Sequence, residues 1–257
     1  MKLSAVVTAT NDKELYCDFI PIFIETWKKL MPEVLIKIVF VGTEIPEKFN
    51  KYKDYLILFT PHSWISTCFV SQYIRMLYAS LIDVDGGVMI TDMDMLPMNR
   101  EYYVDNIKDV DNDKFFCYRD VLHTECAQIP ICYNIALPET WSKIFKIKTE
   151  EDIHQLLNEV DYKIEYEDRH AGVGWGTDQN HLFLAVHKYE NTNNVKIFEY
   201  KKDSETGYKR LDRDDINSRT LGVSVCEDIK NHKYTDYHLN RPMSKFDALN
   251  WKIFYHL

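Results

Sequence analysis

The sequence predicts a single α/β domain. Short apolar or β-branched runs alternate with helical stretches through the first half of the chain, a pattern typical of an α/β sheet. The 257 residues are enough for one sizeable core, and 46% hydrophobic with 28% charged residues is an ordinary globular balance. Because no internal repeat or low-complexity linker divides the chain, we expect one compact domain with a looser lobe after residue 200.

The first sixty residues predict strand, helix, strand and strand in that order. The run 3–10 begins apolar and ends in small polar residues, which indicates a buried strand that leads into a loop. Residues 18–30 have helical spacing, with Pro21 in the first turn, where proline is tolerated. The β-branched run 34–41 and the apolar run 55–59 predict two further strands.

Residues 64–82 predict a long helix, because this stretch contains neither glycine nor proline. Apolar side chains cover most of its surface, which indicates a buried helix. Arg75 is the one cation in this stretch, so we expect it to have an anionic partner or to face a cleft.

The second half predicts fewer regular elements. Residues 201–218 are rich in charge and indicate a solvated loop. The predicted elements are strands at 88–91, 114–118 and 195–200, and helices at 139–145, 150–160 and 182–186.

Charge and cysteine spacing exclude several classes of protein. With 31 Lys and Arg against 40 Asp and Glu, the net charge is −9, which argues against nonspecific binding of nucleic acid. None of the six cysteines has Cys-x-x-Cys spacing, so a zinc ribbon is not expected. No apolar run approaches the ~20 residues that span a bilayer, and no secretory signal is visible. We therefore expect a cytoplasmic protein without a membrane span.

The strongest motif is the carboxylate pair Asp92 and Asp94. Strand 88–91 delivers the pair at its carboxyl end, where ligands gather in open α/β sheets. Carboxylate oxygens are the ligands that hard divalent cations prefer, although a solvated turn is the alternative reading. Asp83 and Asp85 have the same spacing but no preceding strand, and we interpret them as a helix end and turn capped by Gly86 or Gly87.

The segment from Arg75 to Tyr78, followed by Gly86 to Pro97, resembles the nucleotide-sugar site of GT-A-type glycosyltransferases. The resemblance is to metal-dependent families with an Asp-x-Asp (DXD) motif, such as the sugar-binding-DXD and glycogenin-like families, and it covers residues 75–97. Two features depart from the family pattern. Thr91 stands where an apolar residue is usual, and the turn that carries Asp83 is longer.

The resemblance implies a mixed, mostly parallel sheet with helices on both faces. Residues 1–110 would form a Rossmann-like nucleotide-sugar-binding half, and 111–257 would form the acceptor-binding half and C-terminal segment. It also implies manganese, or magnesium, bound by Asp92 and Asp94, with Asp94 bridging the cation and the donor diphosphate. Asp92 would reach the ribose or sugar, and Arg75 would approach the donor or brace the motif.

The resemblance further places Thr8, Ala9 and Thr10 around the donor base and ribose. These three residues lie at the end of the first predicted strand, so they could also be no more than a strand end.

A glycine-rich loop, 172–176, precedes Asp178 and is expected on the acceptor side. Glycines let a backbone come close to a ligand, and Trp175 offers a flat face for a sugar ring. The resemblance places Trp175 and Gly176 near the acceptor and Asp178 near the anomeric carbon, as a catalytic base or an orienting group. The alternative for Asp178 is an N-cap of the helix that follows.

Three further candidates come from the rest of the chain. The resemblance implies that His238 completes the metal site, although His232 and His170 are rivals of His238. Arg241 would pair with the diphosphate. Asn134 would contact sugar or acceptor, with a turn residue as the alternative.

The predicted activity is metal-dependent transfer of a hexosyl or pentosyl group from a nucleoside-diphosphate sugar to a glycan or other hydroxyl acceptor. The resemblance favours uridine diphosphate sugars and leans slightly toward retention of configuration.

A nucleotidyltransferase is an alternative, but such enzymes usually carry a glycine-rich basic loop after the first strand, and residues 8–12 lack Gly and Arg. A catalytically inactive carbohydrate-binding module is another, and the intact Asp92, Asp94 and Asp178 argue against it. A haloacid-dehalogenase-like phosphatase would have its Asp-x-Asp motif near the N-terminus.

Overall fold

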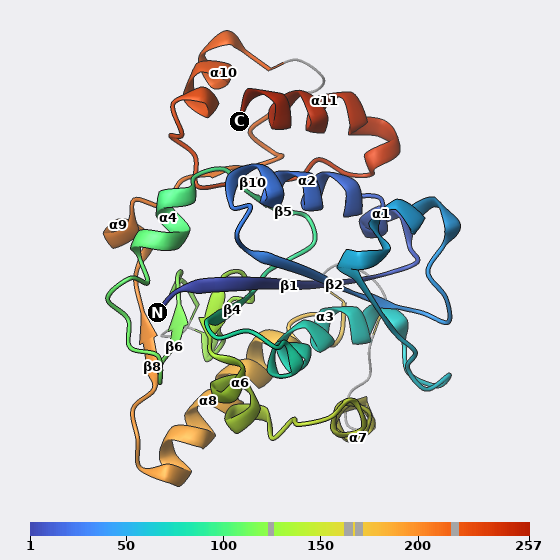
Figure 1. Cartoon of the computed structure of the whole chain (residues 1–257), viewed down its shortest axis with the longest axis vertical. Coiled ribbons are helices and arrows are strands. Elements are labelled where there is room, and N and C mark those ends of the chain that lie inside the picture. The colour runs from blue at the N-terminus through green and yellow to red at the C-terminus, as the bar shows by residue number, and fades with distance from the viewer. Residues whose placement is uncertain (123–125, 162–166, 168–171, 217–220) are drawn as a thin grey trace.

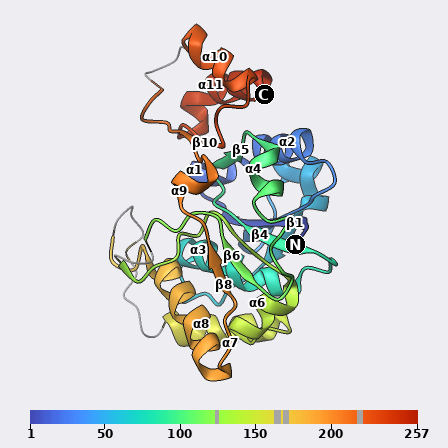
Figure 2. The same ribbon diagram turned by 90° about the vertical axis from the view of Figure 1, so that its left-hand side faces the viewer.

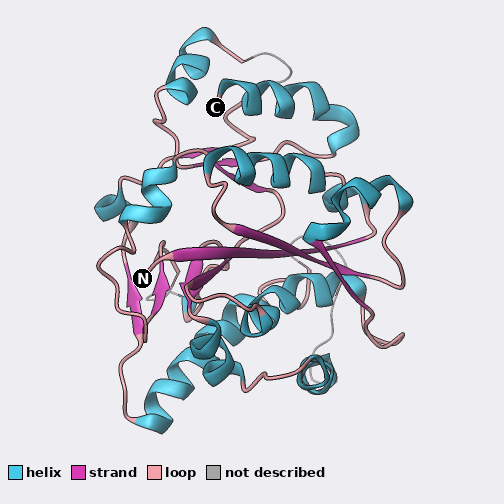
Figure 3. Cartoon of the chain, viewed as in Figure 1, coloured by secondary structure: helices cyan, strands magenta, loops and turns pink. Residues whose placement is uncertain are grey.

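The computed structural model describes residues 1–122, 126–161, 167, 172–216 and 221–257. Its centre is a seven-stranded sheet of order β3-β2-β1-β4-β7-β6-β8, which lies between two layers of helices (Figures 1 and 3). The strands are β1 Leu3–Asn11, β2 Leu35–Val41, β3 Leu56–Phe59, β4 Gly87–Ile90, β6 Phe115–Cys117, β7 Asn134–Ala136 and β8 Phe198–Tyr200. Among these strands only β7 runs antiparallel to its neighbours, so the sheet is mixed and mostly parallel, as expected.

Helices cover both faces of the sheet and divide the core into two apolar clusters. One face carries α1 Glu14–Cys17, α2 Ile20–Leu30 and α4 Arg100–Asp105, with α10 Val223–Lys230 and α11 Met243–His256 beyond them (Figure 2). The other face carries α3 Thr67–Tyr78, α6 Pro138–Phe145, α7 Glu150–Asp161 and α8 Thr177–Asn193. The other helices in the described residues are α9 Asp203–Thr206 and the 3₁₀ helices Glu47–Tyr55 and Ala79–Leu81. No helix in the described ranges has the length and hydropathy that a membrane crossing requires.

A second, three-stranded sheet joins the C-terminal part of the chain to the segment after β4. Its order is β5-β10-β9, with β5 Met95–Pro97, β9 Arg210–Leu211 and β10 Asp236–His238. The prediction of a solvated loop over 201–218 was therefore wrong, since α9 and β9 lie within it. The charge of Arg210 did not prevent a strand, because its Nη2 lies 3.0 Å from Oδ2 of the fully buried Asp236.

The two glycines before β4 provide close packing and do not cap a helix. The predicted helix 64–82 ends as a 3₁₀ turn at Leu81. A Cβ atom on Gly86 would lie 2.1 Å from Ser4 Oγ, and one on Gly87 would lie 2.6 Å from Ile135 Cδ1. The interpretation of these glycines as caps was wrong, because their small size is what lets β4 fit between β1 and β7.

Candidate active site

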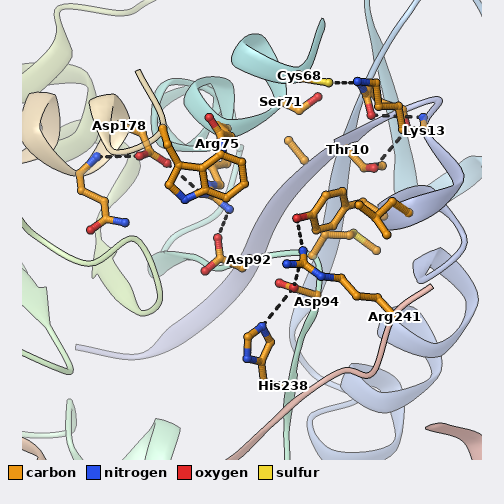
Figure 4. Close-up of a pocket in the computed structure, with 18 of the residues that line it drawn as sticks. Thr10, Lys13, Cys68, Ser71, Arg75, Asp92, Asp94, Asp178, His238 and Arg241 are labelled. Carbon is orange, nitrogen blue, oxygen red and sulfur yellow. Dashed lines mark hydrogen bonds and ion pairs between the residues drawn. The ribbon is translucent and has the colours of Figure 1, made fainter. Parts of the chain in front are cut away.

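The carboxyl ends of β1 and β4 open into a cavity of 370 Å³. Loops after both strands, the helices α3 and α8, and the segments after β9 and β10 line it. It brings together most of the residues predicted from the sequence, namely Ala9, Thr10, Arg75, Asp92, Asp94, Trp175, Asp178, His238 and Arg241. In Figure 4, Asp178, Arg75 and Asp92 form one group, and Asp94, His238 and Arg241 form a second.

Three other predicted residues do not line this cavity. Thr8 is fully buried within β1. Asn134 is fully buried in β7, and its side chain donates to the carbonyl oxygens of Pro130 and Ile131 at 2.6 and 2.8 Å. Because these bonds hold Asn134 inside the sheet, we no longer assign it to the acceptor. Gly176 is the N-cap residue of α8, next to the lining residue Trp175.

Of the two rival histidines, His232 does not replace His238. The Nδ1 of His232 lies 3.3 Å from the carbonyl oxygen of Met98, and His232 does not line the cavity. His170 lies outside the described residues.

Arg75 joins two carboxylates in the wall of the cavity. Only 7% of the residue is exposed; its Nη1 donates to Asp92 and its Nη2 to Asp178 Oδ2 at 2.9 Å. Burial disfavours the charged guanidinium, but the two carboxylates outweigh burial and raise the pKa of Arg75. The expectation of an anionic partner is confirmed for Asp92, while the pairing with Asp178 was not predicted.

Asp178 lies in the first turn of α8, whose N-cap position is taken by Gly176. The alternative reading of Asp178 as the helix cap was therefore wrong. Its Oδ1 accepts a hydrogen bond from the backbone N–H of Gln179 at 2.8 Å. Burial raises the pKa of Asp178 above its ordinary value, and Arg75 offsets only part of that rise.

Asp94 lies at the meeting point of β5 and β10. The strand pairing places His238 opposite Met95, and the N–H of Leu239 donates to the carbonyl oxygen of Asp94 at 2.9 Å. Three groups approach Asp94 Oδ2, with His238 Nε2 at 3.2 Å, Arg213 Nη1 at 3.4 Å and Arg241 Nη1 at 3.7 Å. Burial alone would raise the pKa of Asp94, but the hydrogen bond from His238 and the neighbouring positive charges lower it.

Sequence reasoning missed Asp212 and Arg213, which reach the site from the segment after β9. Asp212 Oδ2 lies 3.3 Å from His238 Nδ1, on the side of the ring opposite Asp94. Leu211 is the one apolar residue from Arg210 to Arg213, so this segment shows no alternating pattern that would predict a strand.

The donor set around His238 suits a divalent cation. Each ring nitrogen of His238 faces a carboxylate oxygen, with Asp94 Oδ2 3.2 Å from Nε2 and Asp212 Oδ2 3.3 Å from Nδ1. A histidine that gives its other N–H to a carboxylate is the arrangement usual for a metal ligand. In the described part of the chain, no three His, Cys, Asp or Glu side chains are already gathered as a metal-binding cluster.

No protein-family model and no curated protein sequence matches the chain. Solved structures do. One is the galactosyltransferase LgtC in complex with donor and acceptor sugar analogues. The alignment covers 98% of this chain and 96% of the LgtC chain, with a TM-score of 0.51 and 12% sequence identity. Another is the glycosyltransferase GlyE of Streptococcus pneumoniae TIGR4. That alignment covers 99% of this chain and 60% of the GlyE chain, with a TM-score of 0.50 and 14% sequence identity.

The chain has a glycosyltransferase fold. The GT-A-type architecture expected from the sequence is confirmed, with its mixed central sheet and helices on both faces. In this glycosyltransferase fold, the cavity lies at the carboxyl ends of β1 and β4, the edge at which open α/β sheets collect ligands.

Proposed function

We propose that the chain is a glycosyltransferase that moves a hexosyl or pentosyl group from a nucleoside-diphosphate sugar to a hydroxyl of a glycan or similar acceptor. A uridine diphosphate sugar is the favoured donor, and manganese or magnesium is the favoured cation. One observation carries the proposal. On a glycosyltransferase fold, Asp92 and Asp94 enter the cavity directly after β4, with His238 Nε2 3.2 Å from Asp94 Oδ2.

The donor would occupy the part of the cavity next to β1. Ala9 and Thr10 offer small side chains and backbone groups for the base and ribose. Lys13, Arg213 and Arg241 also line the cavity and bring positive charge to the position of a diphosphate. Although the whole chain carries a net charge of −9, these local cations make the cavity suitable for an anion.

Asp92, Asp94 and His238 would hold the cation. A divalent cation bound there would offset the negative charge that develops on the departing nucleoside diphosphate. Arg75 keeps Asp92 in place from behind, because its Nη1 donates to Asp92 while its Nη2 is held by Asp178.

The acceptor would enter beside Trp175 and Asp178. Trp175 gives a flat, partly exposed face, and Asp178 presents a buried carboxylate at the cavity wall. In an inverting reaction Asp178 would accept the proton of the acceptor hydroxyl, and in a retaining reaction it would orient the acceptor by hydrogen bonds.

The test of the proposal is a thermal-shift panel of nucleoside diphosphates and their sugars, with and without manganese. A specific ligand at 100 times its dissociation constant adds about 2.7 kcal/mol of stability. Release of nucleoside diphosphate from the stabilising donor would show catalysis, whereas binding without release would favour an inactive binding module. Release of pyrophosphate from a nucleoside triphosphate would favour a nucleotidyltransferase instead.

Replacement of Asp178 by asparagine is expected to lower sugar transfer by about 100-fold, because a positioned acid–base group typically contributes that much or more. Donor affinity is expected to change little, since the proposed donor contacts lie elsewhere in the cavity. Steady-state rates and donor titrations on the same variant check both quantities. Unchanged turnover would remove Asp178 from the reaction, and a parallel loss of donor affinity would move it to the donor site.

Replacement of Asp212 by asparagine is expected to lower manganese affinity by about 10- to 100-fold, the usual cost of losing the partner behind a ligating histidine. The physical reason is that Asp212 holds the Nδ1 side of His238. Isothermal titration with manganese measures the effect, and Asp214→Asn is the matched control, because its side chain is exposed. Equal manganese affinity in the two variants would show that Asp212 does not orient His238.

A further inference from the structure

Asp94 is surrounded by cationic side chains that differ in how firmly they are held. Arg241 donates to the hydroxyl of Tyr16, and its guanidinium lies 5.3 Å from the centre of that ring. His238 is held from behind by Asp212. Arg241 and His238 therefore each have a second side-chain partner besides Asp94.

Arg213 is held less firmly than either. Its Nη1 makes two contacts, to Asp94 Oδ2 and to the carbonyl oxygen of Leu239, and both are long at 3.4 Å. It follows the two-residue strand β9 and so lies outside any helix or strand. Its side chain is 18% exposed and lines the cavity. Arg213 is therefore a cation at the proposed metal site that can move away at small cost.

The position of Arg213 creates a conflict of charge. The guanidinium of Arg213 neutralises the same carboxylate that a divalent cation would need as a ligand. A cation bound to Asp94 and the guanidinium would also repel each other, because both are positive and both lie next to this carboxylate. A diphosphate beside the cation would offer the guanidinium a better partner, because arginine forms charge-assisted, bidentate hydrogen bonds with phosphate oxygens.

We propose that Arg213 is a movable counter-ion that links metal binding to donor binding. Without donor, Arg213 pairs with Asp94 and weakens metal binding. With donor present, Arg213 transfers to the diphosphate and frees Asp94 for the cation. This inference rests on the proposed function and adds an order to it, in which cation and donor bind together and each raises the affinity of the other.

The test is Arg213→Gln, measured by isothermal titration with manganese chloride alone and with UDP in the presence of manganese. Without nucleotide, manganese affinity is expected to rise about fivefold or more, the lower range of typical couplings between sites. UDP affinity is expected to fall by about tenfold or more, because a charge-assisted hydrogen bond is lost. The two changes have opposite signs, which a merely destabilised site would not produce.

Two further variants complete the experiment. Arg213→Lys keeps the charge, so manganese affinity without nucleotide should stay at the wild-type value while UDP affinity falls; this result also stands if the Gln variant does not fold. Arg100→Gln removes an exposed arginine paired with Glu33 and should change neither affinity. Unchanged or lower manganese affinity in folded Arg213→Gln, or higher manganese affinity in Arg213→Lys, would overturn the inference. Failure of the wild-type protein to bind UDP in the presence of manganese would instead contradict the donor and cation that the proposed function favours.

Discussion

Asp94→Asn is expected to abolish the part of nucleotide binding that depends on manganese. Asparagine keeps the volume of the side chain but removes the charge that a hard cation requires. Removing a residue that only hydrogen-bonds to a metal ligand already lowers metal affinity by about 10- to 100-fold. Removing the charge of the proposed ligand Asp94 should therefore lower manganese affinity by more than about 100-fold. Thermal shifts with UDP should then be the same with and without manganese, and sugar transfer should fall at least in proportion.

The chain supplies a matched control for this variant. Asp85 belongs to a second Asp-x-Asp sequence at the opposite end of β4, where its side chain is exposed. Asp85→Asn makes the same change of charge and should leave manganese and UDP binding unaltered. If Asp94→Asn binds both ligands as the wild-type protein does, the proposed metal site is wrong.

Arg75→Met is expected to lower the free energy of unfolding by about 3–5 kcal/mol, the usual cost of removing one partner from a buried ion pair. This loss of stability arises because Asp178, rather than Asp92, is left as a buried carboxylate without its cation. The side chain of Asp178 is 4% exposed and that of Asp92 is 31% exposed, so water can reach Asp92 when the guanidinium is gone. Urea unfolding monitored by circular dichroism measures the change.

The deficit of the Arg75→Met variant should shrink as the pH is lowered. Burial already raises the pKa of Asp178 with Arg75 present, and removing the cation raises it further. A carboxyl group with a higher pKa in the folded state takes up its proton there first, so folding gains stability as the pH falls through that pKa. Unfolding curves at several pH values test this dependence.

Two controls separate charge from packing in this experiment. The double variant Arg75→Met with Asp178→Asn should recover most of the lost stability, because it removes the stranded charge. Arg100→Met breaks an exposed ion pair with Glu33 and should cost no more than about 1 kcal/mol. If the double variant is as unstable as Arg75→Met alone, the loss comes from packing.

The sequence was sufficient to predict six of the seven described strands of the central sheet, but not β7 Asn134–Ala136. The β-branched run 34–41 and the uninterrupted helix after residue 64 have local patterns that tertiary contacts do not override, and both elements formed close to their predicted bounds. The second sheet was not predicted, because β9 and β10 have only two and three residues. Strands this short have too little periodicity to be recognised.

For the candidate site, predictable and unpredictable residues differ in what determines their position. Asp92 and Asp94 follow a hydrophobic strand, which fixes them at one edge of the sheet. The partners Arg213 and Asp212 are placed by the pairing of β9 with β10, across 26 residues of sequence. Asn134 has the composition of a site residue, yet its hydrogen bonds to nearby carbonyl oxygens hold it inside the core.

The three-stranded sheet has a consequence for the order of events during synthesis. Asp94 lies 144 residues before His238 and 119 before Arg213, so these contacts close only after long stretches of chain have been made. A nascent chain that has left the ribosome as far as residue 200 has β1, β4 and the Asp-x-Asp pair, but none of the groups that surround Asp94. Such a chain cannot form the proposed cation site. A truncated product that ends near residue 200 is therefore expected to lack the proposed cation site and the sugar transfer that depends on it.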